Sequence, residues 1–175
     1  MPPVALNRNT WDEHTLLGKG ARHGDGHRRR LMAVSSGGGH WIQLLRVSSA
    51  FSSCDVTFVT VHELYRAQVA GQRFYTVNDA TRWNKVGLIK TALKLAWIIW
   101  KERPEIVVST GAAPGYVAVR LGRLMGARTI WLDSLANIEH ISMSAQKVGR
   151  HADLWLTQWA HLAKPEGPHY TGSVL

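Results

Sequence analysis

Residues 31–45, LMAVSSGGGHWIQLL, decide the fold of this chain. The apolar run from Leu31 to Val34 has no polar alternation, which is typical of a strand buried on both faces. It ends in a turn with three consecutive glycines, Gly37 to Gly39. A helical pattern follows from His40, with apolar side chains at Ile42, Leu44, Leu45 and Val47. A strand, a glycine-rich turn and a helix form the opening unit of a nucleotide-binding α/β domain.

The glycine turn suits a phosphate group. Glycines let a ligand approach the backbone closely, and the N–H groups at a helix start, with the positive end of its dipole, attract anions. A tight turn without a ligand is the alternative. No Lys-Ser/Thr follows the glycines, so the turn is not a P-loop. Ile42 stands where the dinucleotide fingerprint needs its third glycine. We therefore expect neither NAD nor ATP to bind this turn through its usual sequence motif.

Composition describes a basic globular protein. The 175 residues are 45% hydrophobic and 19% charged, which are globular values, and they carry a formal net charge of +9. The charge favours anionic partners such as phosphates or an acidic membrane surface. The single cysteine, Cys54, indicates a reducing compartment. No signal peptide and no membrane-spanning apolar run is visible, so we expect a cytosolic protein.

Two regions are predicted. Residues 1–30 lack any period and end in the basic run His27 to Arg30, which predicts a disordered basic leader. From residue 31 to 175, strands alternate with helices, which predicts one α/β domain with a doubly wound, mostly parallel, Rossmann-like sheet. The six expected strands are residues 31–34, 56–61, 73–77, 105–109, 129–132 and 154–157.

The segment from Val86 to Lys101 predicts a helix with an unusually wide apolar arc. Its lysines fall along one stripe, and most of the remaining circumference is aliphatic or tryptophan. One interpretation is a helix that lies in a membrane interface. The other is a helix packed fully into the core with its lysines outward. On the first interpretation the residues in contact with the membrane are Leu93, Trp97, Ile98 and Trp100.

The turns at the carboxyl ends of the strands are recognisable together. The motifs are SSGGGH at 35–40, STGAAPGY at 109–116, WLDSLANIEH at 131–140, HADLWLTQW at 151–159 and HYTGSVL at 169–175. In this order they resemble the family of asparagine-linked glycosylation protein fourteen and the PssD-like proteins. More distantly they resemble the N-terminal domain of MurG. The resemblance covers roughly residues 31–175.

The resemblance implies half of an enzyme. The chain is similar to the acceptor-side, membrane-facing, N-terminal half of a GT-B glycosyltransferase. The implied partner is a separate donor-binding subunit, either PssE-like or similar to asparagine-linked glycosylation protein thirteen. The implied acceptor is a polyprenyl-diphosphate-linked saccharide, and the donor a nucleotide-sugar such as a UDP-sugar. The chain would act peripherally on the cytoplasmic face of an anionic membrane, without nucleic acid.

The two glycine loops of the family would lie near the acceptor diphosphate. The matching residues in this chain are Ser36, Gly37, Gly38, Gly39, Gly111, Gly115 and Tyr116. His40, at a helix start where the dipole disfavours imidazolium, is a candidate base for the acceptor hydroxyl. Asp133 and Glu139 lie on the same predicted rim and are alternative bases. We expect no metal and no cofactor.

Two classes of function remain open. The first is a glycosyltransferase subunit that is inactive without its partner. The second is a noncatalytic membrane scaffold that only positions the partner. A stand-alone nucleotide-binding protein is a third interpretation, which the missing fingerprint disfavours. Candidate contacts to the partner are Trp155, Trp159 and Leu162.

Overall fold

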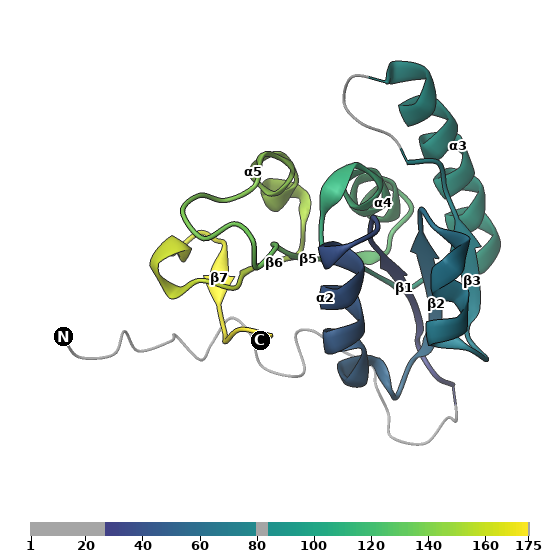
Figure 1. Ribbon diagram of the computed structural model, residues 1–175, viewed down its shortest axis with the longest axis horizontal. Helices are drawn as coiled ribbons and strands as arrows, with labels where there is room; N and C mark the ends of the chain where they lie inside the picture. Colours follow the sequence, from purple (N-terminus) through teal and green to yellow (C-terminus); the bar gives the residue numbers. More distant parts are fainter. Residues whose placement is uncertain (1–26, 80–83, 175) are drawn as a thin grey trace.

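The computed structural model describes residues 27–79 and 84–174. The predicted leader falls mostly on residues 1–26, outside the described part, and stays a prediction. The described chain forms one seven-stranded sheet in the order β3-β2-β1-β4-β5-β6-β7, and every neighbouring pair is parallel (Figure 1). The strands are β1 (Arg30–Val34), β2 (Asp55–Thr60), β3 (Arg73–Thr76), β4 (Ile106–Ser109), β5 (Arg128–Leu132), β6 (Leu154–Thr157) and β7 (His169–Tyr170).

The predicted fold class is confirmed, and the six predicted strands agree with β1 to β6 within one residue at each end. The α-helices of the described residues are α2 (Gly39–Val47), α3 (Lys85–Glu102), α4 (Ala112–Leu124) and α5 (Met143–Val148). Short 3-10 helices cover Ser48–Phe51, Glu63–Val69, Gly149–His151 and Ala160–Leu162. Strand β7 was not predicted, because two residues are too few to give an alternating pattern.

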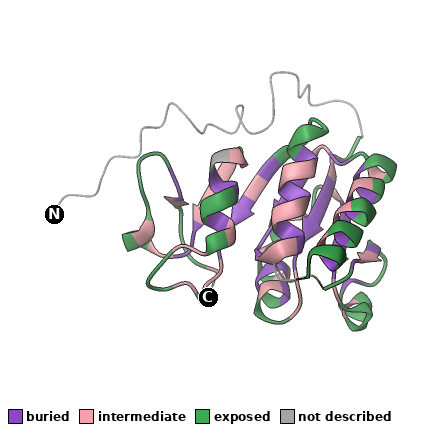
Figure 2. Ribbon diagram, turned by 90° about the horizontal axis from the view of Figure 1, so that it is seen from above, coloured by how far each residue is buried: buried purple, intermediate pink, exposed green. Residues whose placement is uncertain are grey.

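Two apolar layers cover the sheet, one on each face. Met32 and Val34 of β1 pack with buried residues of α3, α4 and α5, whereas Leu31 and Ala33 pack with Trp41 and other residues beneath α2. Successive strand residues point to opposite faces, so one strand serves both layers. Figure 2 shows the buried positions gathered in the sheet and on the helix faces turned toward it. The continuous apolar run of β1 is therefore explained.

Helix α3 is both packed and exposed. Leu95, Ile98 and Ile99 are at most 2% exposed and belong to the core. The prediction that Ile98 contacts a membrane is therefore wrong, because its side chain faces the sheet. A second row of apolar side chains points away from the core, with exposed fractions of 48–67%. These residues, called the outer stripe below, are Val86, Ile89, Leu93, Trp97 and Trp100.

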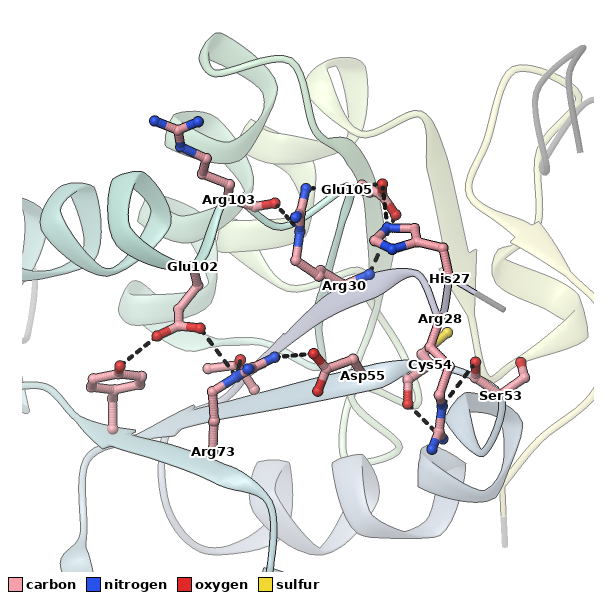
Figure 3. A network of polar contacts seen from close by, with 12 residues as sticks. His27, Arg28, Arg30, Ser53, Cys54, Asp55, Arg73, Glu102, Arg103 and Glu105 are labelled. Atoms are coloured by element: carbon pink, nitrogen blue, oxygen red, sulfur yellow. Dashed lines mark hydrogen bonds and ion pairs between the residues drawn. The ribbon is translucent and has the colours of Figure 1, made fainter. Parts of the chain in front are cut away.

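The amino ends of the strands carry a network of polar contacts (Figure 3). Arg30, the first residue of β1, donates through Nε to the carbonyl oxygen of Arg103 at 2.9 Å. Arg73, the first residue of β3, pairs with Asp55 and, at 3.1 Å, with Glu102 at the end of α3. These partly exposed pairs contribute little stability each. The candidate site lies at the opposite edge of the sheet, where the strands end.

Candidate functional site

A cleft of about 440 Å³ lies at the carboxyl edge of the sheet. It is lined by Ser36, Gly37 and His40 after β1, Val61 and His62 after β2, Asp79 after β3, Ala112 to Pro114 after β4, and Ser144 of α5. Strand β1 has β2 on one side and β4 on the other, so the strand order reverses between β1 and β4. Crevices at such a switch point are the usual ligand sites of open α/β sheets.

Two helices begin beside this cleft. Helix α2 starts at Gly39 after Gly38, whose φ of 64° suits glycine, and no side chain caps it. Helix α4 starts at Ala112, also without a side-chain cap. Ala112 has φ of 63°, a left-handed conformation that costs a non-glycine residue of order 1 kcal/mol. Both helix starts present main-chain N–H groups and positive dipole ends, an arrangement that favours an anion.

His40 is held by a reciprocal pair of hydrogen bonds to Thr110. The imidazole Nδ1 lies 2.9 Å from the carbonyl oxygen of Thr110, and the Thr110 hydroxyl donates to the carbonyl oxygen of His40 at 2.7 Å. A carbonyl oxygen only accepts, so Nδ1 must carry the proton. In the neutral ring Nε2 then keeps its lone pair and is the atom that can accept a proton.

Gly111 makes this position of His40 possible. Its φ is 137°, and a Cβ added there would lie 2.6 Å from Cε1 and 2.7 Å from Nδ1 of His40. No side chain fits between the imidazole and the β4–α4 turn. The glycine that the sequence assigned to the diphosphate therefore admits the His40 ring.

Gly115 has a packing role. A Cβ at this position would lie 1.9 Å from the Ser109 hydroxyl oxygen and 3.6 Å from the Trp131 ring, so only glycine lets α4 approach β4 this closely. Tyr116 is partly buried and packs against the core beneath α4. Neither residue lines the cleft described above, so the structure does not bring these two predicted ligands to the site.

We expect Gly115→Ala to destabilise the fold by about 1–3 kcal/mol, since overpacking a tight contact costs this much. Gly39→Ala is the matched control, because nothing lies within 4 Å of a Cβ there. Urea denaturation of both variants measures the difference. Equal midpoints for Gly115→Ala and the unaltered chain would contradict the close approach of α4 to β4.

Neither of the two predicted carboxylate bases is among the residues that line the cleft. Asp133 is 2% exposed, and its carboxylate accepts hydrogen bonds from the Asn137 amide, the Ser142 hydroxyl at 2.7 Å and the Ser142 backbone N–H. Its side chain therefore organises the loop from 133 to 142. Glu139 is exposed on that loop. Neither residue lines the cleft, and Asp79, an exposed carboxylate that does line it, was missed.

The remaining predicted residues divide between the cleft and its rim. Ser36 and Gly37 line the cleft, whereas Gly38 and Gly39 are exposed at the start of α2. His62 and Asp79 stand two and three residues after the ends of β2 and β3, so the rule that ligands gather at strand ends points to both. No glycine motif marks them, and the sequence interpretation relied on such motifs.

Comparison with models of protein families finds no match. Among curated proteins, the chain is 24% identical over 147 residues to the UDP-N-acetylglucosamine transferase subunit ALG14 of Yarrowia lipolytica. The match covers 79% of this chain and 63% of that protein, so the chain spans somewhat less than two thirds of its relative.

Among solved structures, MurG of Acinetobacter baumannii matches with a TM-score of 0.67 and 14% identity, over 83% of this chain and 45% of MurG. A UDP-N-acetylglucosamine 2-epimerase from Rickettsia bellii matches with a TM-score of 0.65 and 13% identity, over 85% of this chain and 46% of the epimerase. These matches concern the fold. Together the comparisons confirm the resemblance that the sequence motifs predicted.

Proposed function

We propose that this ALG14-like chain, which shares its fold with MurG, is the acceptor-binding and membrane-recruiting subunit of a two-part glycosyltransferase. The observation that supports it most is the His40 imidazole in the cleft, with Nδ1 bound to the Thr110 carbonyl and Nε2 left as the basic atom. A glycosyltransferase needs such a base on the acceptor hydroxyl.

The proposed reaction transfers a sugar from a nucleotide-sugar to a polyprenyl-diphosphate-linked saccharide. The acceptor hydroxyl oxygen attacks the anomeric carbon of the donor sugar, and His40 Nε2 takes the hydroxyl proton. The bond from the anomeric carbon to the nucleoside diphosphate breaks, and the diphosphate leaves. The name of the curated relative suggests UDP-N-acetylglucosamine as the donor.

The acceptor diphosphate is proposed to bind across the starts of α2 and α4. Ser36 and Gly37 line the cleft there, and the two helix dipoles supply positive charge. The donor sugar would be held by a separate donor-binding subunit, similar to asparagine-linked glycosylation protein thirteen or to PssE.

Membrane recruitment is assigned to the outer stripe of α3. Its residues are spaced three or four apart, so they share one helix face, with the exposed Lys90 and Lys94 beside it. Apolar and cationic side chains together suit an anionic membrane surface. The Thr91 hydroxyl donates to the Asn78 carbonyl at 2.9 Å, which ties α3 to the residue before Asp79 in the cleft. A lipid-linked acceptor would therefore meet the membrane-facing helix and the cleft together.

Within the described residues, no helix combines the length and the apolar character that crossing a bilayer requires. We propose, from the outer stripe itself, peripheral binding at the cytoplasmic face with these side chains inserted among lipid headgroups.

The double variant Leu93→Glu with Trp97→Glu should float with anionic liposomes at a small fraction of the unaltered chain's yield, because it places two charges on the inserted face. Both residues are exposed, so the fold should tolerate the change. Leu124→Glu is the matched control, since Leu124 is 76% exposed but lies on α4. Equal flotation of the double variant and the unaltered chain would rule out recruitment by α3.

The direct test of the proposed function is reconstitution. The chain is combined with a donor-binding subunit, UDP-N-acetylglucosamine and a polyprenyl-diphosphate-linked saccharide, and the lipid product is analysed by mass spectrometry. An acceptor extended by one sugar supports the proposal. Unchanged acceptor in the presence of a partner that binds the chain would contradict it.

A further inference from the structure

The cleft contains a second histidine, His62, which comes from outside the glycine motifs. It is the last residue before the 3-10 helix Glu63–Val69. Its ring lies directly against Gly37: a Cβ added to Gly37 would be 2.7 Å from Cδ2 and 3.1 Å from Nε2 of His62. The side chain missing at position 37 is therefore what lets this imidazole reach the first glycine loop.

The segment after His62 holds the ring in this place. The Tyr65 hydroxyl accepts a hydrogen bond from the Gly38 N–H at 2.9 Å, and the Tyr65 ring stacks on Trp41 with centroids 4.9 Å apart. Trp41 in turn donates from Nε1 to the Gln68 side chain at 2.7 Å. The His62 ring packs edge-on against Tyr65, with centroids 5.8 Å apart. The helix from 63 to 69 is thus fixed to the start of α2, and His62 with it.

The charges around His62 make its role specific. Among the described residues that line the cleft, none is Lys or Arg, and the titratable side chains are His40, His62 and Asp79. The Nδ1 of His40 is already bound to the Thr110 carbonyl. In the described part of the chain, no hydrogen bond or ion pair engages the His62 ring. Both of its nitrogens remain available to a ligand.

We propose that His62 binds an oxygen of the diphosphate, as an N–H donor and cation, while His40 takes the proton from the acceptor hydroxyl. This assignment rests on the proposed function, because it places a diphosphate in the same cleft. Helix starts alone carry partial charge, whereas a diphosphate brings full negative charges. An imidazolium beside Gly37 supplies a full positive charge, and Asp79 is the one carboxylate among the described cleft residues that opposes it.

The first test measures the affinity of the full chain for inorganic pyrophosphate by isothermal titration calorimetry. His62→Ala should weaken binding about tenfold or more, since a hydrogen bond to a charged group contributes about 1.5–3 kcal/mol. His62→Arg should stay within about threefold of the unaltered chain, because the cation is kept. His140→Ala is the matched control, an exposed histidine outside the cleft.

With the partner subunit present, His62→Ala should raise the acceptor KM by a similar factor of about ten and change kcat less than about threefold. Far-ultraviolet circular dichroism confirms that each variant is folded. Unaltered pyrophosphate affinity in His62→Ala would overturn the assignment. So would a loss confined to kcat, or no measurable pyrophosphate binding by the unaltered chain at millimolar concentration.

A diphosphate occurs both in the lipid-linked acceptor and in the nucleotide-sugar, so two further titrations separate the sources. Geranyl diphosphate and UDP are each titrated into the unaltered chain and His62→Ala. A His62-dependent preference for geranyl diphosphate assigns the site to the acceptor, and one for UDP assigns it to the donor. If His62 governs diphosphate binding but the reconstituted pair transfers no sugar, the proposed function fails alone. If transfer depends on His40 while the affinity for diphosphate is the same in His62→Ala as in the unaltered chain, the assignment of His62 fails alone.

Discussion

The chain assayed alone is expected to transfer no detectable sugar, and activity should appear when the donor-binding subunit is added. The described cleft of about 440 Å³ has the volume of a site for one small ligand. The match to MurG spans 45% of that protein and shows a shared fold. Holding two reactants in register contributes up to about 7–11 kcal/mol to catalysis, and a chain that holds one reactant forgoes most of this.

The measurement is radiolabelled sugar incorporation into the lipid-linked acceptor, with and without the partner. Pyrophosphate binding by the same preparation serves as the control that the cleft is intact. Robust transfer by the purified chain without any partner would refute the two-part enzyme.

His40→Ala should lower the turnover of the reconstituted pair by about a hundredfold or more, which is the usual contribution of a general base. The imidazole Nε2 is the basic atom in the cleft, since Nδ1 donates to Thr110. Gly111→Ala should also lower turnover, because its Cβ would lie 2.6 Å from the ring. Steady-state kinetics at saturating donor measures both, with His140→Ala as the control.

Partner binding is measured beside turnover, by size-exclusion chromatography, so that a lost complex is not mistaken for lost chemistry. A change under about threefold in His40→Ala would favour a noncatalytic scaffold. The alternative explanation is that Asp79 is the base, because its carboxylate also lines the cleft.

The fold could be predicted from the sequence because the signals are local. The apolar runs at 31–34 and 106–109 mark buried parallel strands, and glycines and prolines separate them from helices. The same local signals do not show which residues of α3 are buried, because apolar side chains lie on both faces of this helix. Only packing separates the buried Ile98 from the exposed Trp97, one position away along the chain.

The candidate site could be predicted in part. His40 and Gly37 stand in a recognisable motif, and both line the cleft. His62 and Asp79 stand in no motif, and they reach the cleft because parallel strands end at one edge. Asp133 was a candidate base because of its position after a strand, but the hydrogen bonds that occupy its carboxylate come from residues four and nine positions later. Hydrogen bonds within a loop produce no periodic pattern in the sequence from which they could be predicted.

A main-chain oxygen, the carbonyl of Thr110, fixes the proton of His40 on Nδ1, so substitutions at residue 110 should not change which ring nitrogen carries it. Any amino acid there keeps the carbonyl that accepts from Nδ1, whereas only Ser or Thr keeps the hydroxyl that donates back to His40. A mutational scan of residue 110 would therefore record the loss of a stabilising contact while the tautomer of His40 stays the same. The proton on Nδ1 of His40 is held by a main-chain oxygen of the β4–α4 turn, and a substitution at residue 110 does not remove that oxygen.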